Sequence, residues 1–185
     1  MRLFVAATPP AEQLQALDAV IGERDELLRW VPMQQWHLTL VFCGDVEAAV
    51  VPELRERLAR GAARTPSFEV GLAGAGSFPK QASRARVLWA GLGGDVQTLT
   101  RLAERSAAAA RRSGIAVEDR PFRPHLTLAR ARRDTVDVRP HLQRLSSYAG
   151  EPWRIDAIRL VQSTLGAQVR HETLAEFPLA EGAPS

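Results

Sequence analysis

The chain contains 185 residues, 45% of them hydrophobic, which is enough to bury the core of one domain. Its single cysteine, Cys43, excludes an internal disulfide, and the sequence has neither the Cys/His spacing of a zinc site nor the apolar run of roughly 20 residues that spans a bilayer. The net charge of +3 suits a polyanionic partner, and because the N-terminus lacks the pattern of a secretory signal we expect a cytoplasmic protein.

Hydrophobic spacing predicts a mixture of strands and helices along the chain. Leu14, Leu17 and Ile21 recur at helical spacing after Pro9 and Pro10, and Gly114 is a natural cap for a later helix. The predicted elements, in chain order, are a strand at 2–7, a helix at 11–28, a strand at 36–42, a helix at 46–63, strands at 68–72 and 86–91, a helix at 95–113, a strand at 125–129, a short helix at 140–145, and strands at 155–163 and 170–177.

The order of these elements lacks the strict alternation of a doubly wound parallel sheet. It therefore predicts an α+β fold with antiparallel strand pairing. We expect one domain over residues 1–180, active as a monomer, with residues 181–185 as a frayed tail.

The tetrapeptide His-Leu-Thr-Leu occurs twice, at residues 37–40 and 125–128. The two copies divide the chain into halves of similar predicted structure, so an internal duplication is the simplest interpretation. In a strand, side chains two residues apart share a face, so His37 and Thr39 project to one side while the leucines anchor the other. The second copy behaves in the same way, and together they predict a symmetric polar cleft.

Two imidazoles and two hydroxyls suit in-line displacement at phosphorus. One imidazole takes a proton from the attacking oxygen while the other gives a proton to the departing oxygen. The hydroxyls of Thr39 and Thr127 can donate hydrogen bonds to the non-bridging oxygens, so no metal is required. One copy alone is explained equally well by an ordinary amphipathic strand whose histidine is a polar residue with its hydrogen bonds satisfied, but the repetition favours catalysis.

The sequence around the motifs resembles the two-histidine phosphoesterases, whose paired His-x-Thr-x motifs lie in a two-lobed, pseudo-twofold α+β fold. The string Pro-Phe-Arg-Pro-His-Leu-Thr-Leu-Ala-Arg at residues 121–130 is similar to one branch, the bacterial RNA 2′,3′-cyclic phosphodiesterases, also called 2′-5′ RNA ligases. Residues 2–6, 29–32 and 174–179 resemble the same branch. The resemblance implies RNA as substrate, hydrolysis of a 2′,3′-cyclic phosphodiester to a 2′-phosphomonoester, reversible formation of a 2′-5′ linkage, and neither ATP nor a metal.

The resemblance also implies roles for the motif residues. By position, His37 is similar to the proton donor to the leaving 3′ oxygen, and His125 is similar to the proton acceptor that activates water. Thr39 and Thr127 occupy the positions that bind phosphate.

Several residues beside the motifs are further candidates for substrate binding. Arginines cluster around the second motif and could hold an RNA backbone, although solvated surface arginine explains them equally well. Strand parity places Arg123 on the face of His125 and turns Arg130 away unless the strand has ended there. Phe42 and Trp36 could stack on a base, although core packing also explains both. The arginines of the cluster are Arg120, Arg123, Arg130, Arg132 and Arg133.

The two remaining histidines are interpreted as non-catalytic. His141 has no threonine two residues later. His171 does, but Glu172 replaces the leucine of the other copies and would weaken the core-facing side of the strand. Cys43 is interpreted as a core residue and not as a nucleophile.

Two other classes of function stay open from the sequence. The same chemistry could act on a small cyclic phosphate, a 2′,5′-linked oligonucleotide or an ADP-ribose derivative. A non-catalytic RNA-binding module could instead use the cleft only for recognition.

Overall fold

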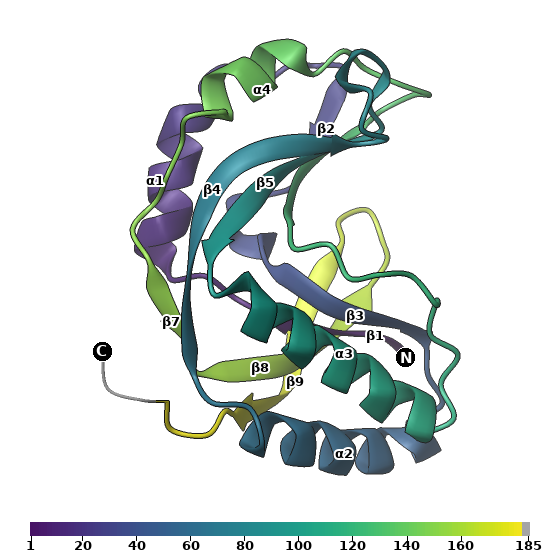
Figure 1. The fold of residues 1–185 in the computed structure, drawn as a ribbon. Coiled ribbons are helices and arrows are strands. Elements are labelled where there is room, and N and C mark those ends of the chain that lie inside the picture. The colour runs from purple at the N-terminus through teal and green to yellow at the C-terminus, as the bar shows by residue number, and fades with distance from the viewer. Residues whose placement is uncertain (183–185) are drawn as a thin grey trace.

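The structure is a computed structural model of the chain, and it describes residues 1–182. Over these residues nine strands form one curled sheet in the order β7-β4-β5-β6-β3-β1-β8-β9, with β2 paired to β6 (Figure 1). All pairs of named strands are antiparallel, which confirms the predicted α+β fold. The strands are β1 (Arg2–Ala7), β2 (Leu28–Trp30), β3 (Leu38–Asp45), β4 (Phe68–Phe78), β5 (Val87–Gly94), β6 (Leu126–Ala131), β7 (Trp153–Ile155), β8 (Ala157–Thr164) and β9 (Arg170–Pro178).

The sheet consists of two halves that meet between β3 and β6. We call β3, β1, β8 and β9 the first half-sheet, and β2 with β7, β4, β5 and β6 the second half-sheet. Only one residue pair, Leu38 with Leu126, joins the two halves in strand register. Each half contains one copy of the repeated motif, as an internal duplication predicts.

Helices cover the outer side of the curl. In Figure 1, α1 and α4 lie beside β4 of the second half-sheet, and α2 and α3 lie along the first. Helix α1 lies on the second half but follows β1 of the first half, and α3 packs on the first half but follows β5 of the second. The two halves are therefore interleaved along the chain. The helices are α1 (Ala11–Ile21), α2 (Val51–Ala63), α3 (Val96–Arg112) and α4 (Arg139–Leu145), and short 3-10 turns lie at Met33–Gln35, Ala48–Val50 and Ala82–Arg84.

The predicted helix at 11–28 is wrong in its second half. Helix α1 ends at Ile21 because Gly22 adopts φ +70, a left-handed conformation that glycine tolerates. The Asp25 carboxylate then accepts a hydrogen bond from the Leu27 amide at 2.8 Å and stabilises a turn. The chain leaves this turn as β2, where Leu28 pairs with Ala131.

Other boundaries differ less. The strand predicted at 68–72 continues to Phe78, past a register shift that accompanies the positive φ of Gly74. The helix predicted at 46–63 begins as a 3-10 turn and becomes α-helical at Val51. Strand β7 was not predicted, because three residues leave little periodicity to detect. Asp95 caps the N-terminus of α3 by accepting a hydrogen bond from the Thr98 amide at 2.9 Å, which would otherwise have no partner within the helix.

The leucines of both motifs lie in the main core, as strand parity predicted. Leu38, Leu40, Leu126 and Leu128 are all buried beneath the helices. The opposite side of the sheet, which we call the open face, carries the histidines and threonines. Cys43 is also a core residue, and burial raises the pKa of its thiol to about 11, so it is a poor nucleophile.

The end of the described chain is attached to the fold. The Gly182 amide donates a hydrogen bond to the Ser67 hydroxyl at 3.0 Å, and the Ala180 amide donates to the Thr65 carbonyl at 2.9 Å. These contacts include residue 182 of the tail predicted at 181–185, the other end of which, residues 183–185, lies outside the described residues. Across residues 1–182, no helix is long and apolar enough to span a membrane.

Candidate active site

The seam between the half-sheets brings the two motifs together on the open face. Because Leu38 pairs with Leu126, the antiparallel register sets His37 opposite Thr127 and Thr39 opposite His125. Diagonal neighbours in such a ladder lie about 7–8 Å apart. The two imidazoles are diagonal neighbours, and the proximity of His125 is one of the causes that lower the pKa of His37. The seam therefore brings two imidazoles and two threonine hydroxyls together.

The first histidine is held on several sides. Its Nδ1 lies 2.7 Å from the Gln35 carbonyl, which can only accept, so Nδ1 carries the proton. Its Nε2 then accepts a hydrogen bond from the Thr39 hydroxyl at 2.9 Å. The Phe4 ring stacks on the imidazole at 4.7 Å between centroids. Burial lowers the pKa of His37 to about 4, so its Nε2 is unprotonated near neutral pH.

The second histidine has the same backbone partner but different neighbours. Its Nδ1 donates to the Arg123 carbonyl at 2.6 Å, so its Nε2 is also the unprotonated nitrogen. The Phe78 ring meets His125 edge-on at 5.0 Å, and the Trp89 ring lies at 6.1 Å. Burial is the largest cause that lowers the pKa of His125, and the nearby charge of Arg130 lowers it further. Among the described residues no group bonds its Nε2.

A β-bulge in β6 corrects the prediction for Arg130. Trp89 pairs with Thr127 and Leu88 pairs with Ala129, so Leu128 is an extra residue in the ladder. Beyond the bulge the parity of the strand reverses. Arg130, opposite Val87, therefore shares the face of Thr127, and the prediction that it points away was wrong.

Strand β3 contains a bulge at the same point of its motif. Ala6 pairs with Thr39 and Val5 pairs with Val41, so Leu40 is the extra residue. Phe42 consequently lies on the open face with Thr39, opposite Phe4. Phe42 as a residue is 47% exposed, so it is accessible to a ligand.

The Phe42 ring also has a cationic neighbour. The Arg2 guanidinium lies 4.8 Å from its centroid, within cation–π range. Trp36, the other aromatic candidate, is 1% exposed, and its indole nitrogen donates to the Val31 carbonyl at 2.9 Å. Trp36 is thus a core residue and Phe42 the accessible one.

The predicted arginine cluster does not converge on one site. Arg123 precedes β6 and places its guanidinium 6.0 Å from the Phe78 ring, beside the second histidine. Arg120 instead pairs with Glu118, and Arg132 donates to the Glu26 carbonyl at 2.9 Å.

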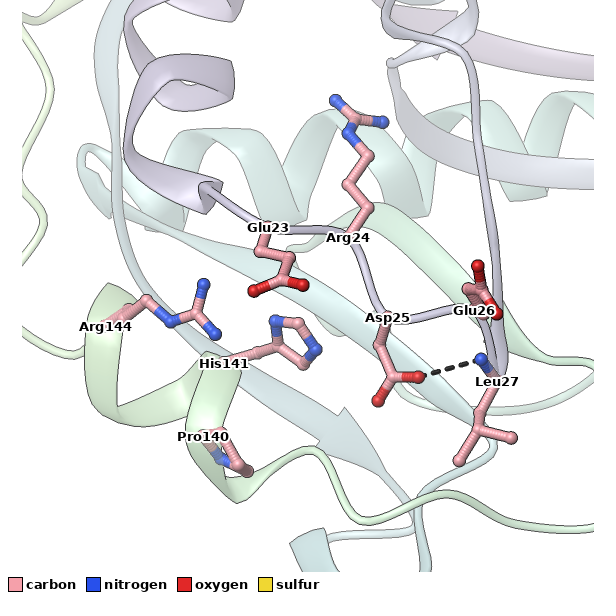
Figure 2. A pocket seen from close by; sticks show the side chains of 8 residues that line it. All are labelled: Glu23, Arg24, Asp25, Glu26, Leu27, Pro140, His141 and Arg144. Carbon is pink, nitrogen blue, oxygen red and sulfur yellow. Dashed lines mark hydrogen bonds between the residues drawn. The ribbon is translucent and has the colours of Figure 1, made fainter.

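His141 lies away from the motifs. It is 4% exposed on α4, where its ring packs edge-on against Trp30. Figure 2 shows it in a surface hollow between Glu23 and Asp25, with Arg144 beside it. This position on the outer side of the second half-sheet agrees with its interpretation as non-catalytic.

His171, in contrast, lies on the open face beside the first histidine. Its ring centroid is 5.5 Å from that of His37 and 5.1 Å from that of Phe4. The expected weakness from Glu172 does not arise, because β9 is an edge strand and Glu172 is exposed to solvent. The loose His-x-Thr-x pattern was the available sequence signal for this contact.

Comparison with known proteins gives one consistent family. The model of the 2′-5′ RNA ligase superfamily matches residues 5–167. An RNA 2′,3′-cyclic phosphodiesterase from Geobacillus stearothermophilus is 30% identical over 184 residues, which are 98% of this chain and 58% of that protein. The Escherichia coli protein of the same name is 33% identical over 151 residues, 75% of this chain and 77% of that one. The chain thus spans less than two thirds of the first relative and more of the second.

Solved structures show the same fold. TT0787 of Thermus thermophilus superposes with a TM-score of 0.80 at 30% identity, covering 98% of this chain and 99% of that one. LigT of E. coli in its apo form gives a TM-score of 0.77 at 28% identity, covering 97% and 98%. LigT has also been solved in complex with 3′-AMP, and that structure gives a TM-score of 0.77 at 29% identity, again covering 97% and 98%.

Proposed function

Because this chain belongs to the 2′-5′ RNA ligase superfamily, we propose that it is an enzyme that hydrolyses 2′,3′-cyclic phosphate ends of RNA to 2′-phosphomonoesters. One observation supports the proposal: Leu38 pairs with Leu126, which brings a histidine–threonine pair from each half-sheet together at the seam. The names of the relatives indicate the same reaction. We propose that the unit is one domain over residues 1–180, acting as a monomer in the cytoplasm.

The proposed reaction is an in-line displacement at phosphorus. His125 takes a proton from water as the water oxygen bonds to phosphorus, and the bond from phosphorus to the 3′ oxygen breaks. His37 gives its Nε2 proton to that 3′ oxygen, which leaves a 2′-phosphate and a 3′-hydroxyl. If a ribose 5′-hydroxyl replaces water, the same steps form a 2′-5′ linkage.

The resting protonation states bear on this division of roles. Both Nε2 atoms are unprotonated in the free enzyme, so the base is ready and the acid must acquire a proton. A bound phosphate raises the pKa of an adjacent imidazole, because opposite charge favours the protonated form. A low intrinsic pKa then makes His37 a strong acid once it is protonated.

Thr39, Thr127 and Arg130 are proposed to bind the non-bridging oxygens of the phosphate. The hydroxyls donate hydrogen bonds, and the guanidinium adds a charge-assisted one. Phe42 is exposed on the same face and is proposed to stack on a base of the RNA. Arg123, whose guanidinium lies beside the Phe78 ring, is proposed to contact the RNA backbone.

The test is turnover of an RNA oligonucleotide ending in a 2′,3′-cyclic phosphate, with EDTA present. We expect a 2′-phosphate product, separable from the 3′-phosphate isomer, and no loss of rate from the chelator. Nucleoside 2′,3′-cyclic phosphate measured in parallel separates an RNA substrate from a small one. RNA binding without any turnover would support the recognition module and contradict the proposal.

A further inference from the structure

We propose that His171 is a positioning residue for His37, and that the β8–β9 hairpin holds the first imidazole in place through it. The inference rests on the proposed function and adds a third histidine to it. His171 belongs to β9 and is far from His37 in sequence. In the sheet, β1 and β8 lie between β9 and β3, the strand that His37 immediately precedes, so the contact joins the two ends of a four-strand segment.

The register of the hairpin sets the direction of the His171 side chain. Ser163 pairs with His171 and Val161 pairs with Thr173. Val161 also pairs with Phe4, whose ring stacks on His37. Paired residues share a face, so all of these side chains lie on the open face with the first motif.

The rings of this group contact one another directly. The planes of His171 and His37 are inclined by 75° at 5.5 Å, an edge-to-face contact, and His171 meets Phe4 at 70° and 5.1 Å. Phe4 lies nearly parallel to His37, at 26°. The first imidazole is therefore stacked on one ring and blocked from tilting by another.

A hydrogen bond also links the tip of the β8–β9 hairpin to Gln35, the residue whose main-chain carbonyl binds His37. The Gln35 side-chain amide donates to the Val169 carbonyl, just before β9, at 2.7 Å. The Gln35 main-chain carbonyl accepts the Nδ1 proton of His37 at 2.7 Å. Gln35 thus joins the tip of the hairpin to the orientation of the imidazole, so a displaced hairpin would move both restraints on His37.

The contact also has an electrostatic consequence. Among the described residues, the titratable groups that act on His37 are His171 from β9 and His125, which immediately precedes β6, and both lower its pKa, while Phe4, Thr39 and Gln35 carry no charge there. Burial lowers the pKa of His171 as well, so it is neutral at neutral pH and adds no repulsion. Below the pKa of His171 its charge opposes protonation of His37.

The experiment compares two replacements of the same ring. His171→Ala removes both the packing and the titrating group, whereas His171→Phe keeps an aromatic ring of similar reach. We expect His171→Ala to lower kcat about 10-fold with KM changed less than about twofold, since small misplacements of a reacting group reduce kcat strongly. His171→Phe is expected to restore most of kcat.

A titration of the His37 ring by NMR gives a readout that simple destabilisation does not produce. His171→Phe removes a like charge without opening the site, so we expect the pKa of His37 to rise. Glu172→Gln, the neighbouring exposed position on the other side of β9, serves as the control and is expected to match the wild type in kcat and in the His37 titration.

The outcomes separate this inference from the proposed function. Wild-type kcat and an unmoved His37 titration in both His171 variants would overturn the positioning role. If the wild type fails to hydrolyse cyclic-phosphate RNA, the proposed function falls, and the His37 titration still tests whether His171 acts on it. Gln35→Ala, which releases the Val169 carbonyl, is expected to lower kcat less than His171→Ala does; a larger effect would assign the restraint to Gln35 alone.

Discussion

The two half-sheets repeat the same backbone arrangement around the motif histidine but place different side chains beside it. In each, the histidine Nδ1 donates to the carbonyl two residues earlier and a bulge follows the threonine by one residue. The residue five positions after the histidine then faces the site. That residue is Phe42 in the first half and Arg130 in the second.

The difference divides the work of the site. In the first half the Phe4 ring stacks on the imidazole and the Thr39 hydroxyl donates a hydrogen bond to His37, and burial there holds the pKa of His37 at about 4. The second half leaves the His125 Nε2 free and adds a guanidinium close by. We infer that Phe42 of the first half suits a nucleoside base and that Arg130 of the second half suits the phosphate oxygens.

Removing either motif histidine is expected to have the largest effect on activity and tests whether both halves are needed. His37→Ala and His125→Ala are each expected to lower kcat on cyclic-phosphate RNA by about 100-fold or more, as the loss of a general acid or base does. Circular dichroism of each variant checks that the fold is intact. Undiminished turnover in either variant would refute the paired roles.

Stability against pH compares the same two residues. The pKa of His37 falls from 6.5 in the unfolded chain to about 4 in the folded one, so the unfolded state binds more protons between these values. The free energy of unfolding is therefore full above about pH 6.5 and falls as pH drops towards 4, by about 3 kcal/mol for this residue.

Urea unfolding between pH 7 and pH 4 measures this loss. His37→Gln should flatten the decline more than His125→Gln does, because the His37 imidazole is stacked on Phe4 and hydrogen-bonded at both nitrogens, whereas the His125 imidazole is bonded by the described residues only at Nδ1 and meets Phe78 edge-on. Equal slopes in the two variants would show that the half-sheets do not differ in this respect.

Removal of the guanidinium tests the phosphate side. Arg130→Ala is expected to lower kcat/KM by about 10- to 100-fold, the range of a hydrogen bond to a charged group. Arg132→Ala is the matched control, because its guanidinium donates to the Glu26 carbonyl, and it should change kcat/KM less than about twofold. Similar losses in both variants would mean that only net charge matters.

Removal of the accessible ring tests the nucleoside side and has the smallest expected effect. Phe42→Ala should raise KM for RNA about fivefold and leave kcat nearly unchanged, as the loss of one weak base stack predicts. The measurement is steady-state kinetics on an oligonucleotide. A fall in kcat without a change in KM would contradict stacking by Phe42.

The sequence predicts the fold class and the motif geometry well, because both depend on local periodicity. His37 with Thr39, and their counterparts in the second motif, share a face as a period of two requires. The leucines between them are buried for the same reason. These features need no knowledge of the partner strand.

The features that the sequence did not predict depend on pairing with distant residues. A bulge adds one residue to a ladder without altering the local pattern, so the position of Arg130 could not be read from parity. Strand β2 forms only because Ala131 and its neighbours lie beside it. The contact of His171 with His37 requires the order of four strands, which no local signal fixes.

Within the described chain only one residue pair, Leu38 with Leu126, joins the strands beside the two imidazoles, so we expect the separation of the rings to respond to a bound anion. A slight change in twist between β3 and β6 would move the rings relative to each other above the one core that both halves share. An anion bound by both imidazoles would link the two half-sheets at this junction. Inorganic phosphate should then raise the Tm in a concentration-dependent way, since whatever binds only the folded state stabilises it.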